Sequence, residues 1–306
     1  MKSLLTALSA MVLAAAGLSV APAARAGDVS RIAVICAYPP EAPALMAALH
    51  DTKTVTINGN PFTTGTMGGK PVVLMMSGVS MVNAAMSTQL LLDHFHVRAI
   101  VFSGIAGGVD PSLHVGDVVA PDQWAQSMEV VLTRKTADGF DKPSLRLDPS
   151  SRAPYGMMAP RGIMAGNADT PFAFHDSFPA DPKLIALARQ VAPSVHLKAC
   201  NAAGLCLEHA PQVVVGGVGV SAPAFVDNAE YRSYLFDTFH ARATDMESAA
   251  VVQVAYANEV PAIIFRSLSD LAGGDGGANQ MKTFMGFASD NSAAVVEAFV
   301  AAMPEQ

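Results

Sequence analysis

Apolar residues along this chain follow two patterns, which predict strands that alternate with helices. Largely apolar runs typical of buried strands occupy residues 31–37, 71–77, 98–103, 212–220 and 263–270. Apolar residues at helical spacing occupy residues 79–96, 181–191, 228–240 and 291–302. A hairpin is expected where residues 54–57 and 62–67 flank Asn58-Gly59, and a short strand at 117–120. This order predicts an α/β fold, a single domain with a central mixed, mostly parallel twisted sheet flanked by helices.

Residues 122–180 do not fit either pattern. They contain Pro149, Pro154, Pro160 and Pro171 and show little periodicity. A connection of this length inside a compact domain is uncommon unless it is functional. We therefore expect an excursion that shapes a binding site or packs against a second subunit.

The first 26 residues have the pattern of a signal peptide. Lys2 is followed by the apolar run from Leu4 to Val20, and Ala24-Arg25-Ala26 has the small-x-small form of a cleavage site. The alternative is an uncleaved N-terminal anchor. We expect export, to a bacterial periplasm, and no membrane attachment after cleavage.

Residues 27–306 are expected to form one domain, because no linker-like stretch or repeat divides them. The whole chain has a net charge of −7, and loss of Lys2 and Arg25 with the signal peptide makes the mature chain more acidic. An acidic chain without a basic run argues against a nucleic-acid partner.

The three cysteines stand in different surroundings. Cys36 lies inside an apolar run and is expected to be a small core residue. Cys200 and Cys206 flank a turn-rich stretch, and in an oxidising compartment they can close a small disulfide loop. Two free thiols are the alternative.

Two carboxylates near the end of the chain are the strongest sign of chemistry. Glu247 opens a helical run, and Asp270 ends a strand-like run that is followed by Gly273, Gly274, Gly276 and Gly277. Open α/β sheets bind ligands at the carboxyl ends of their strands. Two acids there can divide the work between holding hydroxyl groups and carrying a proton. The alternatives are a first-turn glutamate favoured by the helix dipole and a capping aspartate.

Four blocks of sequence carry a resemblance to a known family. They are Ala37-Tyr38-Pro39-Pro40-Glu41, Ser77 to Ala85, Ser103-Gly104-Ile105-Ala106-Gly107-Gly108-Val109 with Val115 to Val119, and the segment from Asp245 to Asp270. Together they resemble the nucleoside phosphorylase and nucleosidase superfamily, most like its 5′-methylthioadenosine/S-adenosylhomocysteine nucleosidase branch. The resemblance covers most of the chain after residue 30.

The resemblance implies roles for three carboxylates in cleaving an N-ribosidic bond. Asp270 is expected to protonate the departing purine at N7, with Ser269 orienting it. Glu247 is expected to accept hydrogen bonds from both ribose hydroxyls beside Met246, which packs on the sugar. Glu41 is expected to activate a water, although a solvated loop glutamate is its alternative.

Further residues match substrate-binding positions of the same family. Phe225, followed by Val226, matches the base-stacking position, although a core phenylalanine is an equal alternative. Gly107 is expected to let the backbone approach the nucleoside, unless it serves only a tight turn. Ile105 stands where the nucleosidases commonly have serine. Met281 and Phe284 are expected to supply an apolar wall, and residues 122–180 bear on the 5′ side of the substrate.

The function predicted from these residues is hydrolysis of a purine nucleoside, with adenine as the base and a 5′-thio substituent as one option. Residues 77–85 contain no arginine or lysine to hold a phosphate dianion, which favours water as the nucleophile. A phosphate-dependent phosphorylase and a non-catalytic nucleoside-binding protein remain alternatives. No cofactor is expected, and the histidines form no zinc pattern. The resemblance favours a homo-oligomer, with a dimer preferred. Arg266, in the apolar run before Asp270, requires a charge partner if it is buried.

Overall fold

The computed structural model describes residues 29–141, 152–201 and 204–305, so the expected signal peptide at 1–26 lies outside the described residues. Six α-helices are found in the described part: α1 (Ala42–Ala47), α2 (Met81–His94), α3 (Pro182–Val191), α4 (Ala229–Phe239), α5 (Ser248–Ala257) and α6 (Met281–Ala302). Two short 3₁₀ turns are η1 (Pro39–Glu41) and η2 (Ala192–Ser194). The main sheet contains β1 (Arg31–Cys36), β2 (His50–Ile57), β3 (Asn60–Met67), β4 (Lys70–Met76), β5 (Val97–Gly108), β6 (Val118–Ala120), β7 (Gln123–Gln126), β14 (Phe178–Pro179), β15 (Val213–Val215), β16 (Val218–Ser221), β17 (Ala241–Asp245) and β18 (Ala262–Asp270).

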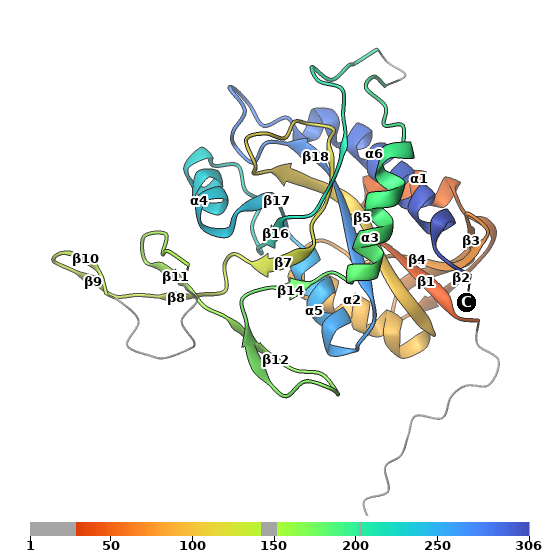
Figure 1. The fold of residues 1–306 in the computed structure, drawn as a ribbon, viewed down its shortest axis with the longest axis horizontal. Helices are drawn as coiled ribbons and strands as arrows, with labels where there is room; N and C mark the ends of the chain where they lie inside the picture. The colour runs from red at the N-terminus through yellow and green to blue at the C-terminus, as the bar shows by residue number, and fades with distance from the viewer. Residues whose placement is uncertain (1–28, 142–151, 202–203, 306) are drawn as a thin grey trace, which may run out of the picture.

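The main sheet is mixed and twisted, with helices on both faces (Figure 1). Its strands follow the order β14-β7-β16-β17-β5-β1-β4-β3-β2, while β18 pairs with β5 and β6, and β15 pairs with β6. Strands β1, β4, β5 and β18 run parallel around the centre, whereas β17 is antiparallel to β5. The predicted α/β fold with a central mixed sheet is therefore confirmed.

Both faces of the central strands are buried, which explains their largely apolar runs. Along β1, Ile32 and Val34 pack in one core with α6 and α3, through residues such as Val296 and Ile185. Ala33 and Ile35 point the other way into a second core with α2 and α5. Successive side chains of a strand face opposite sides of the sheet, so a strand covered on both sides needs apolar residues throughout.

The predicted starts of two helices are confirmed by their caps. The Asp181 carboxylate accepts hydrogen bonds from the backbone N–H groups of Lys183 (2.8 Å) and Leu184 (3.0 Å) at the start of α3. The Asn228 side chain accepts one from the N–H of Tyr231 (2.8 Å) at the start of α4. Such bonds satisfy N–H groups that have no partner inside the helix.

Several sequence-based boundaries were wrong; the helix expected at 291–302, for example, is the end of α6, which begins at Met281. The expected strand 98–103 does not end at Ser103 but continues through residues 104–108 as strand β5, because Gly107 and Gly108 pair with Thr244 and Ala243 of β17. The expected strand 212–220 is two strands, separated by Gly216 and Gly217 at φ +110° and +83°. The break lets the chain leave β6 as a partner and join β7 and β17, a change that local sequence does not reveal.

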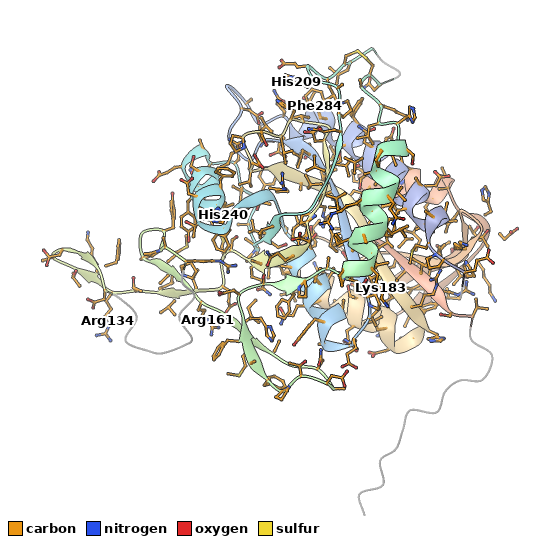
Figure 2. All side chains as sticks on the ribbon, viewed as in Figure 1. Arg134, Arg161, Lys183, His209, His240 and Phe284 are labelled. Atoms are coloured by element: carbon orange, nitrogen blue, oxygen red, sulfur yellow. A yellow bond between two sulfur atoms is a disulfide. The ribbon has the colours of Figure 1, made fainter. Side chains whose placement is uncertain are left out.

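The excursion at 122–180 is built largely from short strand pairs that extend from the body of the molecule (Figure 1). β8 (Val130–Leu132) pairs with β11 (Met158–Pro160), β9 (Lys135–Thr136) with β10 (Gly139–Phe140), and β12 (Ile163–Ala165) with β13 (Ala173–His175). Arg134 and Arg161 mark this extension in Figure 2. Strands of two or three residues are too short to show periodicity, so the sequence did not reveal them.

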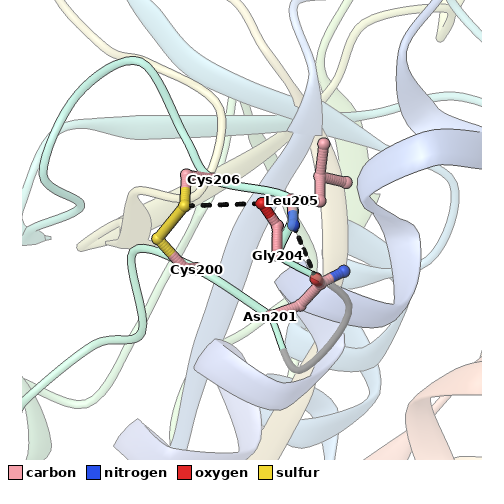
Figure 3. The surroundings of a disulfide bond; sticks show 5 residues. All are labelled: Cys200, Asn201, Gly204, Leu205 and Cys206. Atoms are coloured by element: carbon pink, nitrogen blue, oxygen red, sulfur yellow. Dashed lines mark hydrogen bonds between the residues drawn. A yellow bond between two sulfur atoms is a disulfide. The ribbon is translucent and has the colours of Figure 1, made fainter.

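Cys200 and Cys206 form a disulfide, as expected (Figure 3). Cys36 is free and buried. The Asn201 side-chain oxygen also accepts a hydrogen bond from the Leu205 N–H at 3.0 Å inside this small loop. No helix within the described ranges is long and apolar enough to cross a membrane.

Candidate active site

A cavity of about 200 Å³ opens where β1, β17 and β18 end. This is the edge at which an α/β sheet places its ligands, because loops diverge there and leave room between them. The cavity is lined by Ala37, Tyr38, Glu41, Val79, Ile105, Ala106, Gly107, Phe225, Thr244, Asp245, Met246, Glu247, Ser269, Asp270 and Met281. The three predicted catalytic carboxylates, far apart in sequence, therefore face one space.

A buried arginine, Arg266, lies behind this cavity, and three acids are its charge partners. The Arg266 guanidinium is fully buried, with Nε 2.7 Å from Asp245 Oδ2 and Nη2 3.3 Å from Glu247 Oε2. Its Nη1 lies 3.9 Å from Glu41 Oε1, and the group stacks 4.1 Å from the centroid of the Phe102 ring. A buried guanidinium is tolerable only when opposite charges compensate its lost hydration.

Glu41 is held rigidly and is not a solvated loop residue. Its carboxylate is 3% exposed and accepts hydrogen bonds from the N–H groups of Ala37 (2.7 Å), Tyr38 (3.0 Å) and Ile105 (2.9 Å). These donors come from the end of β1 and from β5, so the sheet itself fixes the carboxylate. The Ile105 backbone thus supports Glu41 directly, although its side chain offers no polar contact.

Glu247 stands at the start of α5, but its side chain does not cap the helix. Asp245 accepts the hydrogen bonds from the backbone N–H groups of Glu247 (3.3 Å) and Ser248 (3.2 Å) instead. Glu247 Oε1 accepts a hydrogen bond from the N–H of Ser80 at 2.9 Å and lines the cavity. The helix-dipole alternative therefore does not describe what this side chain does.

The surroundings of Glu247 raise the pKa of its carboxyl well above the usual value of a glutamate. Burial raises the pKa of this carboxyl to about 7, and repulsion from Asp245 and Glu41 acts in the same direction. Attraction to Arg266 and the hydrogen bond from Ser80 oppose this rise in pKa. One cation shared among three acids cannot favour the ionised form of every one of them.

Asp270 is buried at the end of β18, and both of its carboxyl oxygens accept hydrogen bonds. Oδ1 accepts hydrogen bonds from the Ala272 N–H (2.9 Å) and the Asn279 side-chain amide (3.4 Å), and Oδ2 accepts one from the Ser269 hydroxyl (2.9 Å). Burial raises the pKa of Asp270, while these three donors limit the rise. A carboxyl that retains its proton more readily than usual suits a general acid.

The remaining predicted residues divide between the cavity wall and its surroundings. Phe225 is 54% exposed and lines the cavity, so it is not a core phenylalanine. Val226 lines an adjoining recess of about 30 Å³, together with Gly107 and Asp270. Met281 lines the main cavity, whereas Phe284, labelled in Figure 2, lies outside both linings. None of the described residues of 122–180 lines the cavity.

Sequence reasoning missed Asp245 and Asn279 as members of the site. Asp245 binds Arg266 and accepts hydrogen bonds from the hydroxyls of Ser221 and Ser248. A buried arginine in an apolar strand was the signal that an additional acid had to be near. Nothing in the local sequence marked Asn279. Within the described residues, no cluster of His, Cys, Asp and Glu side chains is arranged to hold a metal ion.

Comparison with known proteins adds four findings. The sequence model of the phosphorylase superfamily matches residues 31–301. The 5′-methylthioadenosine/S-adenosylhomocysteine nucleosidase of Lysinibacillus sphaericus is 32% identical over 274 residues, which cover 89% of this chain and 100% of that protein. The solved structure of the Neisseria meningitidis enzyme of that name, in complex with methylthio-immucillin-A, has a TM-score of 0.66 and 26% identity and covers 90% of this chain and 100% of its own. The Streptococcus pyogenes S-adenosylhomocysteine nucleosidase, in complex with 5-methylthiotubericidin, has a TM-score of 0.67 and 25% identity, with 91% and 99% coverage.

Gly104 leaves the space that the buried charge cluster needs. A Cβ at this position would lie 1.9 Å from Arg266 Nη1 and 2.7 Å from Glu41 Oε1. We predict that Gly104→Ala lowers the free energy of unfolding by about 1–3 kcal/mol, because the buried guanidinium must move. Urea unfolding measures this.

The matched control is Gly286→Ala in α6, where a Cβ meets nothing within 4 Å. That change should raise helix stability by up to about 1 kcal/mol. A Gly104→Ala protein as stable as the wild type would show that the cluster does not need this space.

Proposed function

The chain belongs to the phosphorylase superfamily, and from that membership we propose that it hydrolyses the N-ribosidic bond of a purine nucleoside. The observation that carries this proposal is the convergence of Asp270, Glu247 and Glu41 on one cavity in front of Arg266. Cleavage of such a bond develops positive charge on the sugar and negative charge on the departing base. Carboxylates in distinct protonation states match both needs, as they do in glycoside hydrolysis.

Asp270 is the general acid in this proposal. Protonation of the purine at N7 neutralises the departing base, and the raised pKa of Asp270 keeps the required proton available. The Ser269 hydroxyl holds the carboxyl in one orientation. Gly107 keeps the neighbouring wall open, since a Cβ there would lie 3.1 Å from Asp270 Oδ1.

Glu247 holds the sugar. Its ionised form accepts hydrogen bonds from ribose hydroxyls, and these bonds strengthen as positive charge grows on the ring. Met246 lines the same cavity and packs against the sugar. Because Ser80 and Arg266 already fix the two oxygens of Glu247, the carboxylate is preorganised before substrate arrives.

Glu41 activates the attacking water. Nη1 of Arg266 makes no hydrogen bond to a described residue and faces Glu41 Oε1 at 3.9 Å. A water in the cavity that hydrogen-bonds to Glu41 loses its proton to this carboxylate as it attacks the sugar, while the guanidinium behind it helps to hold the carboxylate in place. A phosphate dianion would instead meet three carboxylates and a single shared cation, which favours hydrolysis over phosphorolysis.

The substrate in this proposal is an adenine nucleoside with an apolar 5′-thio substituent. The relatives named 5′-methylthioadenosine/S-adenosylhomocysteine nucleosidase support this choice. The cavity walls supply apolar surface through Val79, Met281 and Phe225. Such walls match a thioether and a purine ring better than a charged group.

A homodimer is the assembly that the surface favours. Val82 on α2 is 78% exposed and Met86 is 58% exposed, beside an apolar groove between α2 and α5. Leu132 and Phe172 of the excursion are also largely exposed. We propose that a second copy covers α2 and that 122–180 contributes to this contact. A monomer mass from light scattering would contradict it.

The proposed compartment is a bacterial periplasm, reached through cleavage of residues 1–26. The disulfide between Cys200 and Cys206 supports an oxidising compartment. Amino-terminal sequencing of protein recovered from the periplasm tests this, and a start at Met1 would contradict it.

Base release should need no phosphate. We expect adenine and free methylthioribose from methylthioadenosine in phosphate-free buffer, because water is the nucleophile. Chromatography of the products measures both. Release that requires phosphate and yields a sugar 1-phosphate would establish the phosphorylase alternative, and binding without turnover would establish the binding protein.

Asp270→Asn should lower kcat by about 10²–10⁴-fold, the usual size of general acid catalysis. The amide has the shape of the carboxyl but cannot donate the proton that the base requires. Calorimetric titration with a non-cleavable nucleoside analogue should still show binding. Turnover close to that of the wild type would mean that Asp270 only caps the following loop.

Activity should rise with pH as Glu247 ionises. The pKa of Glu247 in the folded protein is raised to about 7, so kcat/KM should increase up to about pH 7. The contribution of Glu247 to folding stability has the opposite pH dependence. The folded state retains a proton that the unfolded state loses, so this contribution falls between about pH 4.5 and 7.

In Glu247→Gln the rise of kcat/KM up to about pH 7, which is the low-pH limb of the profile, should disappear. The value of kcat/KM should also be reduced. Glu230→Gln, at an exposed position on α4, is the matched control and should keep the wild-type profile. An unchanged limb in Glu247→Gln would assign the titration to another group.

A further inference from the structure

The loop between Asp270 and α6 contains Asn279, whose side chain contacts Asp270, the loop that carries Phe225 and the start of α6. The Asn279 amide nitrogen donates hydrogen bonds to Asp270 Oδ1 (3.4 Å) and to Asp227 Oδ1 (3.1 Å). Its oxygen accepts one from the N–H of Met281 at 2.9 Å. Asp270 is the proposed acid, Asp227 follows the Phe225-Val226 pair, and Met281 lines the cavity.

The two loops that Asn279 joins are also packed against each other through their backbones. The N–H of Asn228 donates to the carbonyl of Ala272 at 3.1 Å. Gly273 has φ +90°, and a Cβ on it would lie 2.3 Å from the nitrogen of Asn228. A shift of one loop therefore displaces the other, together with the wall that carries Phe225.

Asparagine has the chemistry that this position requires. Two carboxylates, Asp227 and Asp270, face its amide, which offers two N–H donors without a charge. An aspartate would repel both of them. The remaining acceptor is used at the start of α6, as an asparagine does in turns that precede a helix.

We infer that Asn279 is a positioning residue that clamps the Asp270 carboxyl to the base-stacking loop at 225–227. The inference rests on the proposed function and deepens it. Asn279 acts through Asp270 and Phe225 and need not touch the substrate. The clamp holds the proton donor and the stacking surface in a fixed relation, which proton transfer to a base stacked on Phe225 demands.

Other charges around Asp270 set the direction of the pH effect. Asp275 lies in the same loop, and its charge disfavours the ionised Asp270 carboxylate, while Asp227 lies across the loop. Arg232 of α4 contacts this loop at Gly274, and Glu247 lines the same cavity. Loss of the donor from Asn279 leaves ionised Asp270 less stabilised, so its pKa should rise further.

The test uses Asn279→Ser in the full-length mature protein. A serine hydroxyl can still accept the hydrogen bond from Met281 at the start of α6, but it is too short to bridge Asp227 and Asp270. We expect kcat/KM for methylthioadenosine to fall about tenfold, because the proton donor and the base-stacking surface are no longer held in a fixed relation. Activity falls at high pH where the proposed acid Asp270 loses its proton, and this high-pH limb of kcat/KM should move to higher pH. The melting temperature should stay close to that of the wild type.

A measurement that needs no substrate keeps the inference separate from the proposed function. Hydrogen exchange in Asn279→Ser should accelerate at residues 224–228 as well as at 271–278, although the mutation lies about fifty residues from the first segment. Asn279→Ala, which also removes the helix-start acceptor, should accelerate both and lower the melting temperature. If the wild type cleaves no nucleoside, the proposed function fails, and hydrogen exchange still decides the clamp.

Two results would overturn the inference. One is unchanged exchange at 224–228 in Asn279→Ser. The other is an active Asn279→Ser protein whose kcat/KM and high-pH limb both match the wild type. A merely structural role would lower stability and activity together and leave the pH limb in place.

Discussion

The buried guanidinium of Arg266 is the interaction on which the site depends. It lies between Asp245, Glu247 and Glu41, and no other cation of the described residues pairs with any of these three. Removing one partner of a buried ion pair typically costs about 3–5 kcal/mol, because the remaining charge stays desolvated. Asp245, Glu247 and Glu41 can therefore line one cavity only because the strand β18 delivers this one cation behind them.

Sharing one cation among three acids also separates their tasks. Glu247 has a pKa raised to about 7 by burial and by its acidic neighbours. Glu41 is fixed by three backbone donors and does not depend on the arginine alone. Asp270 has no ion pair with Arg266, and burial raises its pKa against the three donors that bind it. Similar side chains thus stand in different surroundings, which suit the proposed roles of proton donor, sugar acceptor and water activator.

Much of the fold was accessible from the sequence because buried strands and amphipathic helices have strong local signatures. The apolar run at 31–37 and the cap at Asp181 led to the correct elements. The glycine block at 104–108 was misjudged, since its pairing with β17 involves residues more than a hundred positions away. The short strands of 122–180 gave no local signal, and their place away from the cavity became visible only in three dimensions.

The sequence by itself determined the identities of the acids, their positions at the ends of elements, and the motifs that tie them to a family. These depend on local order along the chain. The tertiary structure decided that Glu41 is clamped rather than solvated, that Phe225 is exposed at the cavity, and that Asp245 and Asn279 belong to the site. It also supplied the partners of Arg266. Burial, charge pairing and pKa depend on which distant residues share a small volume, and only the folded chain specifies that.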